Sequence, residues 1–176
     1  LESGDVVEAF GVADGEFPLA EDAAIDAVYE DNEFVVVDKP AGMPTNPLTP
    51  DETGTLVNAA LHRWPDLRGV GDKALEPGLV HRLDVKTMGL VLFARTNEVH
   101  AFMKNEVRKH RIGKQYLALV SGSPRRPSGE IDLPLGRHPT DPGRMIVAAT
   151  DVKIRGRALT ALTRYRVADS DGRASL

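Results

Sequence analysis

Two short, wholly apolar runs of residues limit the folds open to this chain. Residues 34–37 are a phenylalanine followed by three valines, and residues 89–94 are apolar throughout. Apolar runs that are rich in β-branched and aromatic residues are typical of buried strands. The first run stops at Lys39-Pro40-Ala41-Gly42, a turn signal that ends strand pairing. The sequence therefore predicts a sheet that contains two buried strands.

Helical spacing marks two further segments. From Thr55 to Trp64 the apolar residues follow helical spacing, and Pro65 closes the segment. Thr96 is suited to cap a second helix, whose apolar positions continue to Val107 and whose end is basic. Residues 116–120 and several short runs within 129–167 are strand-like and are separated by Gly and Pro turns. Together these elements predict an α+β fold, with a mixed, mostly antiparallel β-sheet core and flanking helices.

Composition excludes several classes of site. The 176 residues contain no cysteine, which excludes disulfides and thiolate metal sites and suits a reducing cytoplasm. There is no metal-type histidine spacing and no glycine-rich phosphate loop, so we expect neither a metal nor a cofactor. No apolar run approaches the roughly 18 residues of a membrane span, and no secretory leader is visible. We therefore expect a cytoplasmic protein without a membrane partner, and nothing suggests more than a monomer.

Charge is divided unevenly along the chain. Residues 1–60 carry 14 acidic residues and one basic residue, Lys39, whereas residues 104–167 carry 14 Lys and Arg against five acids. Such asymmetry favours a local surface that attracts phosphate, although the net charge is only −4. A solvated basic surface without a ligand explains the charges equally well.

A cluster of charged residues precedes the second apolar run. His81, Arg82 and Asp84 lie where the chain is about to enter a buried strand, a common place for functional loops. Asp84 is flanked by Arg82 and Lys86, and opposite charges favour the ionised carboxylate. An ionised aspartate can act as a covalent nucleophile. Taken alone, a structural ion pair that braces a turn explains the cluster more simply.

Four blocks, in order along the chain, resemble the RluA-type pseudouridine synthases. They are residues 29–42, the His81-Arg82-Leu83-Asp84 motif with Thr87 and Gly89-Leu90, residues 113–122, and Leu135-Gly136-Arg137-His138-Pro139 with Arg144-Met145. A single short motif is a weak signal, but four in the family's order make a strong one. The resemblance extends from about residue 29 to residue 167 and implies the pseudouridine synthase fold.

The resemblance also implies roles for individual residues. Asp84 matches the catalytic aspartate that attacks the target nucleotide, and Tyr116 matches a tyrosine that stacks on the target base. Arg82 resembles a residue that holds the nucleotide out of its stack, with an ion pair to a nearby acid as the simpler alternative. We expect His81 and Leu83 to shape the substrate-binding loop. We expect Lys39 to be a surface charge at the end of a strand.

The implied reaction is the isomerisation of uridine to pseudouridine in structured RNA, either ribosomal or transfer RNA. The C1′–N1 bond is broken, the uracil rotates, and C5 is joined to C1′, without any cofactor. An enzyme that acts on a base within folded RNA must first flip it out of the stack. Basic side chains within residues 104–166 are suited to hold the RNA backbone. Whether Asp84 attacks C1′ or C6 stays open.

Two departures from the family pattern limit the comparison. Met88 stands where family members often have a serine, and the Thr-Gly-Arg-type block that supplies a basic partner to the catalytic aspartate is absent. We therefore expect a C-terminally incomplete catalytic domain over residues 28–176. Residues 1–27 are expected to be a linker, or the remnant that follows an upstream S4-like domain.

Two other functions fit parts of the sequence. A non-catalytic RNA-binding module could keep the synthase fold and its basic surface, and the absent block keeps this alternative open. A glycosidase needs a second acid in the site, whereas the motif supplies only Asp84.

Overall fold

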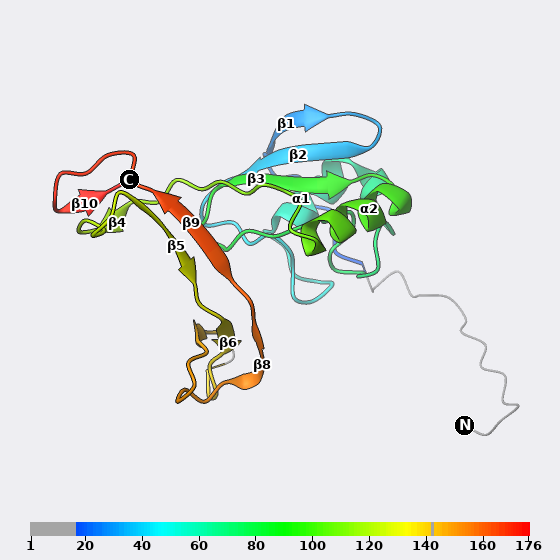
Figure 1. The fold of residues 1–176 in the computed structure, drawn as a ribbon. Helices are drawn as coiled ribbons and strands as arrows, with labels where there is room; N and C mark the ends of the chain where they lie inside the picture. Colours follow the sequence, from blue (N-terminus) through cyan, green and yellow to red (C-terminus); the bar gives the residue numbers. More distant parts are fainter. Residues whose placement is uncertain (1–16, 142) are drawn as a thin grey trace, which may run out of the picture. The chain divides into compact units, whose positions relative to one another are not determined.

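An antiparallel sheet of three strands organises the first part of the chain. In the computed structural model, which describes residues 17–141 and 143–176, β2 lies between β1 and β3 (Figure 1). The strands are β1 Asp26–Glu30, β2 Phe34–Lys39 and β3 Gly89–Ala94. β2 and β3 pair without a break from Phe34↔Ala94 to Lys39↔Gly89. The two predicted buried strands are confirmed, and they are direct neighbours.

The core of this part lies between one face of the sheet and helix α1. Side chains alternate along a strand, so Val35 and Val37 of β2 and Phe93 of β3 point to the same side, and all three are fully buried. Helix α1, Leu56–Arg63, covers them with an almost wholly buried surface. Thr55 caps the helix through a capping box with Asn58. The helix predicted from Thr55 to Trp64 is thus confirmed, and Pro65 begins the short 3-10 turn η2, Pro65–Leu67.

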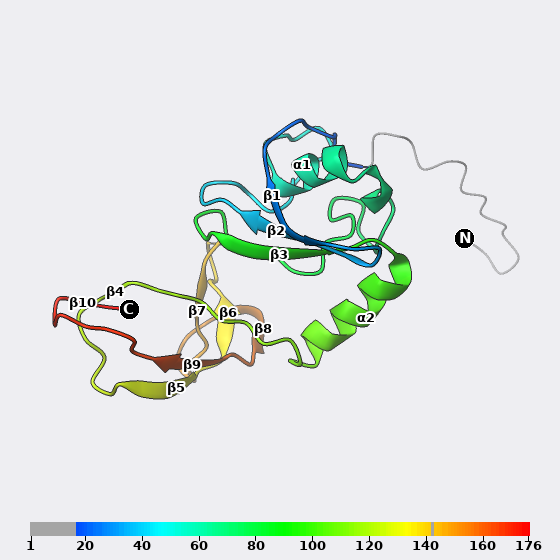
Figure 2. The same cartoon turned by 90° about the horizontal axis from the view of Figure 1, so that it is seen from above.

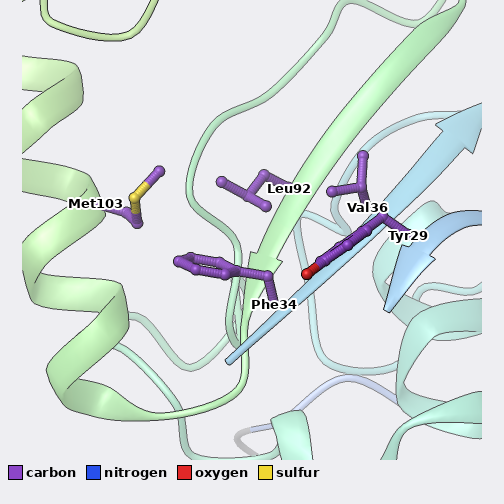
Figure 3. Close-up of a pocket in the computed structure, with 5 residues that line it drawn as sticks. All are labelled: Tyr29, Phe34, Val36, Leu92 and Met103. Carbon is purple, nitrogen blue, oxygen red and sulfur yellow. The ribbon is translucent and has the colours of Figure 1, made fainter. Parts of the chain in front are cut away.

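Helix α2, Asn97–Arg108, lies on the opposite face of the sheet. Its N-cap is Thr96, as predicted, because the Thr96 hydroxyl accepts a hydrogen bond from the Val99 amide. Figure 2 shows α2 and α1 on different sides of the strands. Met103 of α2 faces Phe34 and Leu92 across an open apolar hollow (Figure 3). The sheet therefore carries a helix on each side, but only the α1 side is tightly closed.

The segment before β1 packs against α1. Residues 1–16 of the expected linker lie outside the described residues, and residues 18–25 have no regular secondary structure. The amide group of Asn58 donates to the Leu19 carbonyl (2.7 Å), and Arg63 donates to the Ile25 carbonyl (3.0 Å). Ile25 is itself part of the core. The end of the expected linker is thus irregular but attached to the first part of the fold.

Small antiparallel sheets make up the second unit, Lys114–Leu176, which is distinct from the first, Leu1–Gly113. β4 pairs with β10, β5 with β9, and β6 lies between β7 and β8. The strands are β4 Val120–Ser121, β5 Ser128–Asp132, β6 Leu135–Arg137, β7 Met145–Val147, β8 Arg155–Leu159, β9 Leu162–Arg166 and β10 Ala174–Ser175. Every strand pair in the described residues is antiparallel. The predicted α+β class with a mostly antiparallel sheet is confirmed.

One predicted strand is largely wrong. Of residues 116–120, only Val120 belongs to a strand, because β4 pairs only with the two residues of β10. A strand needs a neighbour along its whole length to satisfy its backbone groups. Without such a neighbour in the described residues, Leu117 is 86% exposed despite its apolar side chain.

Neither α1 nor α2 could cross a membrane. In the part of the chain that the structure describes, no helix is both long and apolar enough for a span.

Candidate active site

The loop that carries Asp84 leaves the sheet and returns to it. Residues 78–80 run beside β3, where the Val80 amide donates to the Leu92 carbonyl (3.1 Å). The loop then turns back at Asp84, whose carbonyl accepts from the Thr87 amide (3.0 Å), and enters β3 at Gly89. The carboxylate of Asp84 stays exposed at this turn. The fold thus presents Asp84 on a short loop, residues 78–88 (the Asp84 loop), with both ends attached to a central sheet.

Gly78 allows the chain to approach β3 this closely. Its φ is +68°, in the left-handed region, and a Cβ there would meet the Ala94 carbonyl oxygen at 2.7 Å. The Gly78 carbonyl accepts from the Ala94 amide (2.7 Å), so the contact is a strand-like hydrogen bond. The start of the Asp84 loop depends on a glycine at this position.

Residues on both sides of Asp84 are attached to a second loop, residues 39–45. The Thr45 hydroxyl donates to the Leu83 carbonyl (2.7 Å) and accepts from the Leu83 amide (3.2 Å). The Val85 carbonyl accepts from the Gly42 amide (2.7 Å) and from the Lys39 ammonium group (3.3 Å). Asp84 is therefore an exposed residue between two anchored neighbours.

The prediction that Lys39 is a surface charge is wrong. Its side chain is fully buried, and its Nζ donates to the carbonyls of Pro40 (2.9 Å) and Met43 (2.7 Å) as well as to that of Val85. Alternation along β2 explains the burial, because Lys39 shares the core-facing side with Val35 and Val37. The sequence does not show which side of β2 faces the core, because residues 34–37 are all apolar and residues 38 and 39 are both charged.

The charge of Lys39 is linked to that of Asp84. Burial lowers the pKa of Lys39 because the ammonium group loses solvation, and the negative charge of Asp84 opposes this shift. Three carbonyl oxygens satisfy the three donors of the ammonium group. Lys39 thus holds the two loops together from the buried side, and its ammonium group is not exposed to a ligand.

The other predicted loop residues lie around Asp84 in different environments. The Arg82 side chain is 60% exposed and forms an ion pair with Glu76 (3.4 Å). His81 is half-buried, and its Nε2 accepts from the Leu92 amide (3.4 Å), which links the loop to β3. Leu83 packs against the hydrophobic core. Their roles toward a substrate stay predictions.

Tyr116 belongs to the second unit. It lies before β4 in a segment without regular secondary structure, and it is 61% exposed. The site described above is therefore built from the first unit, and the stacking role of Tyr116 stays a prediction.

The arrangement suits a large substrate and does not resemble a metal centre. Within residues 17–141 and 143–176, no three His, Asp or Glu side chains come together as a metal site requires. The exposed carboxylate of Asp84 has Arg82 and Lys86 as near neighbours in the loop, and all three are open to solvent. A carboxylate on an exposed, anchored loop can be reached by a group presented by a macromolecule.

Comparison with known proteins identifies the family. Residues 33–176 match the model of the family described as RNA pseudouridylate synthase. The chain belongs to this family. The match covers β2, the 39–45 loop and the Asp84 loop in full.

Curated members of the RNA pseudouridylate synthase family share more than a third of their aligned residues with this chain. Ribosomal large subunit pseudouridine synthase D of Pseudomonas aeruginosa is 39% identical over 142 residues, which are 81% of this chain and 42% of that protein. The protein of the same name from Zymomonas mobilis is 37% identical over 157 residues, 89% of this chain and 47% of that protein. The chain thus spans less than half the length of these relatives.

Solved structures support the same fold. Human RNA pseudouridylate synthase domain containing 1 superimposes with a TM-score of 0.65 at 21% identity, over 86% of this chain and 57% of that one. Human RNA pseudouridylate synthase domain containing 4 gives a TM-score of 0.61 at 23% identity, over 85% of this chain and 56% of that one. The pseudouridine synthase fold that the sequence implied is therefore confirmed.

Proposed function

We propose that this protein converts uridine to pseudouridine in structured RNA, with Asp84 as the nucleophile. Family membership supports the reaction class. The observation that carries the assignment of Asp84 is its position: it is exposed, while its neighbours Leu83 and Val85 are both anchored. A carboxylate held in this way is open to a substrate.

The proposed chemistry needs only a nucleophile and a proton acceptor. If a carboxylate oxygen of Asp84 attacks C1′, the electron pair of the C1′–N1 bond leaves with the uracil. The detached uracil rotates, its C5 forms a bond to C1′, and the bond to the carboxylate breaks. The proton on C5 then passes to a base. Attack of Asp84 at C6 of the uracil is the alternative first step and leads to the same loss of the C5 proton.

The substrate we propose is ribosomal RNA of the large subunit, because several relatives are named ribosomal large subunit pseudouridine synthase D. A base within such an RNA has to be flipped out before Asp84 can reach it. The second unit can contribute to binding, since residues 114–176 carry 11 Lys and Arg against six acids. Arg82 and Tyr116 are proposed to hold the flipped nucleotide. The cytoplasmic and monomeric states stay predictions.

Release of tritium from C5 of uracil tests this function. The full-length protein is incubated with large-subunit ribosomal RNA transcribed in vitro from [5-³H]uridine-labelled precursor, and a transfer RNA transcript is tested in parallel. We expect release by the native protein and a loss of more than about a thousandfold in Asp84→Asn, because the nucleophile is removed. Asp72→Asn, which changes another exposed loop acid of the first unit, is the matched control.

Each outcome has a defined meaning. If the native protein and Asp72→Asn release tritium and Asp84→Asn does not, Asp84 is the nucleophile. Release from transfer RNA alone would move the substrate to that class. If the native protein binds RNA without releasing tritium from either transcript, the chain comes from a non-catalytic RNA-binding module and the proposed function is wrong.

A further inference from the structure

The 39–45 loop forms hydrogen bonds with the backbone of the Asp84 loop on both sides of Asp84. Thr45 uses one buried hydroxyl group to satisfy both the amide and the carbonyl of Leu83. On the other side of Asp84, Gly42 and Lys39 both donate to the Val85 carbonyl. The backbone is therefore held in place on both sides of Asp84, while the Asp84 side chain remains exposed.

Lys39 also gives the 39–45 loop its own shape. Its ammonium group joins the carbonyls of Pro40 and Met43, which belong to this loop, to that of Val85, which belongs to the Asp84 loop. Hydrogen bonds from a charged donor are stronger than those between neutral groups. The 39–45 loop is itself tied to α1, because the Val57 amide donates to the Thr45 carbonyl (3.0 Å). A chain of contacts thus leads from helix α1, through Thr45, to the backbone next to Asp84.

We propose that Thr45 and Lys39 are positioning residues that hold the Asp84 carboxylate in its reactive place by clamping Leu83 and Val85. This inference rests on the proposed function of Asp84. Both residues are buried, so neither contacts RNA, and both act on the reaction through Asp84. Loss of the clamp frees the loop to move, and displacement of a reacting group by about 1 Å can cost roughly a hundredfold in rate.

Thr45→Val tests the clamp with little change in side-chain shape. Valine fills nearly the same volume but removes the hydroxyl, which leaves the Leu83 amide and carbonyl without their partner. We expect kcat for tritium release from the labelled ribosomal RNA to fall about ten- to a hundredfold, with an unchanged KM. Thr45→Ser keeps the hydroxyl and should retain most of the native kcat.

Thr96→Val is the matched control. It also removes a threonine hydroxyl that bonds to a backbone amide, but at the start of α2. We expect this variant to lose stability without a change in kcat at temperatures where it is folded. A purely structural role of Thr45 would instead give Thr45→Val and Thr96→Val similar kinetics, and that result would overturn the proposal.

A measurement on the native protein covers the case in which Thr45→Val does not fold. The Leu83 amide donates to a buried hydroxyl, so its hydrogen exchange should be slow, whereas the exposed neighbours Asp84 and Lys86 should exchange rapidly. Rapid exchange at Leu83 would contradict the clamp. Failure of the proposed function looks different, because the native protein would then be inactive or Asp84→Asn would be active.

Discussion

Asp31 closes the turn between β1 and β2 with a single carboxylate. One of its oxygens accepts from the amides of Glu33 and Phe34 (2.7 Å each), and the other accepts from the Tyr29 hydroxyl (2.6 Å). The Tyr29 hydrogen bond first, and the two backbone amides next, lower the pKa of Asp31 below its usual 3.8. The ionised carboxylate of Asp31 thus stabilises the turn between β1 and β2.

We expect Asp31→Asn to make the stability of the first unit less sensitive to acid. A lowered pKa in the folded state means that Asp31 stabilises the fold above pH 3.8 and that this contribution is lost as the pH falls through the lowered value. Urea midpoints should therefore be lower for Asp31→Asn than for the native protein at neutral pH and should converge with them in strong acid. Asp51→Asn, at an exposed acid, is the control. Parallel curves for native protein and Asp31→Asn would contradict this assignment.

The residues of the Asp84 site differ in how far the sequence could predict them. The motif before β3 located Asp84 on a loop next to a buried strand, and the structure places it there. The contact of Thr45 with Leu83 joins residues 38 positions apart, and no local pattern signals such a contact. The burial of Lys39 could not be predicted, because the apolar run before it does not show which side of the strand faces the core.

Strand β3 shows how one element divides its residues between two environments. Val91 and Phe93 face α1 and are fully buried, whereas Leu90 is 55% exposed on the other side. The apolar run in the sequence does not distinguish the two sides, since every residue from 89 to 94 is apolar. The strand was therefore predictable, but the position of its core had to come from the structure.

Phe93→Ala should destabilise the first unit strongly. Truncating a fully buried phenylalanine removes its apolar contacts and leaves a cavity, at a cost of about 3–5 kcal/mol. Leu90→Ala, in the same strand, should cost less than about 1 kcal/mol because half of its side chain already contacts solvent. Urea unfolding monitored by the fluorescence of Trp64, itself buried in this core, measures both. Equal losses for the two variants would show that the core does not lie on the α1 side.

The same limit explains the error at residues 116–120. An apolar segment becomes a strand only where a neighbouring backbone pairs with it, and pairing over long distances in the chain leaves no local trace. Sequence patterns can predict hairpin-like pairs such as β6 with β7, because Gly and Pro turns separate the two strands. They cannot predict the pairing of β4 with β10, which are far apart in the chain.

Across the whole molecule, the two units carry opposite charge. Residues 1–113 hold 20 acids and 11 Lys and Arg, whereas residues 114–176 hold six acids and 11 Lys and Arg. Within the second unit, Arg137 and Arg155 lie directly opposite each other in the β6–β8 pair. Like charges in this arrangement repel, and a bound phosphate would relieve the repulsion.

We expect Arg155→Gln to weaken RNA binding without loss of stability. Removing one phosphate contact should lower the affinity and reduce by about one the slope of log affinity against log salt concentration. The unfolding midpoint should stay the same or rise, because a like-charge pair is removed. Binding of the ribosomal RNA transcript between low and moderate salt measures the slope, with Arg68→Gln in the first unit as the control. An unchanged slope in Arg155→Gln would exclude this arginine from the RNA-binding surface.

The pairing of β2 with β3 also has a consequence for how the protein acquires its shape. Phe34 pairs with Ala94, and α1, the 39–45 loop and the Asp84 loop all lie in the chain between them. Closing so long a segment costs chain entropy before any contact compensates for it, and such pairings form slowly. The Asp84 loop leads into β3, and its hydrogen-bond partners lie in the 39–45 loop, which follows β2. These hydrogen bonds therefore cannot form until β2 and β3 have paired. The proposed nucleophile therefore reaches its working position late in folding, only after β2 and β3 have paired.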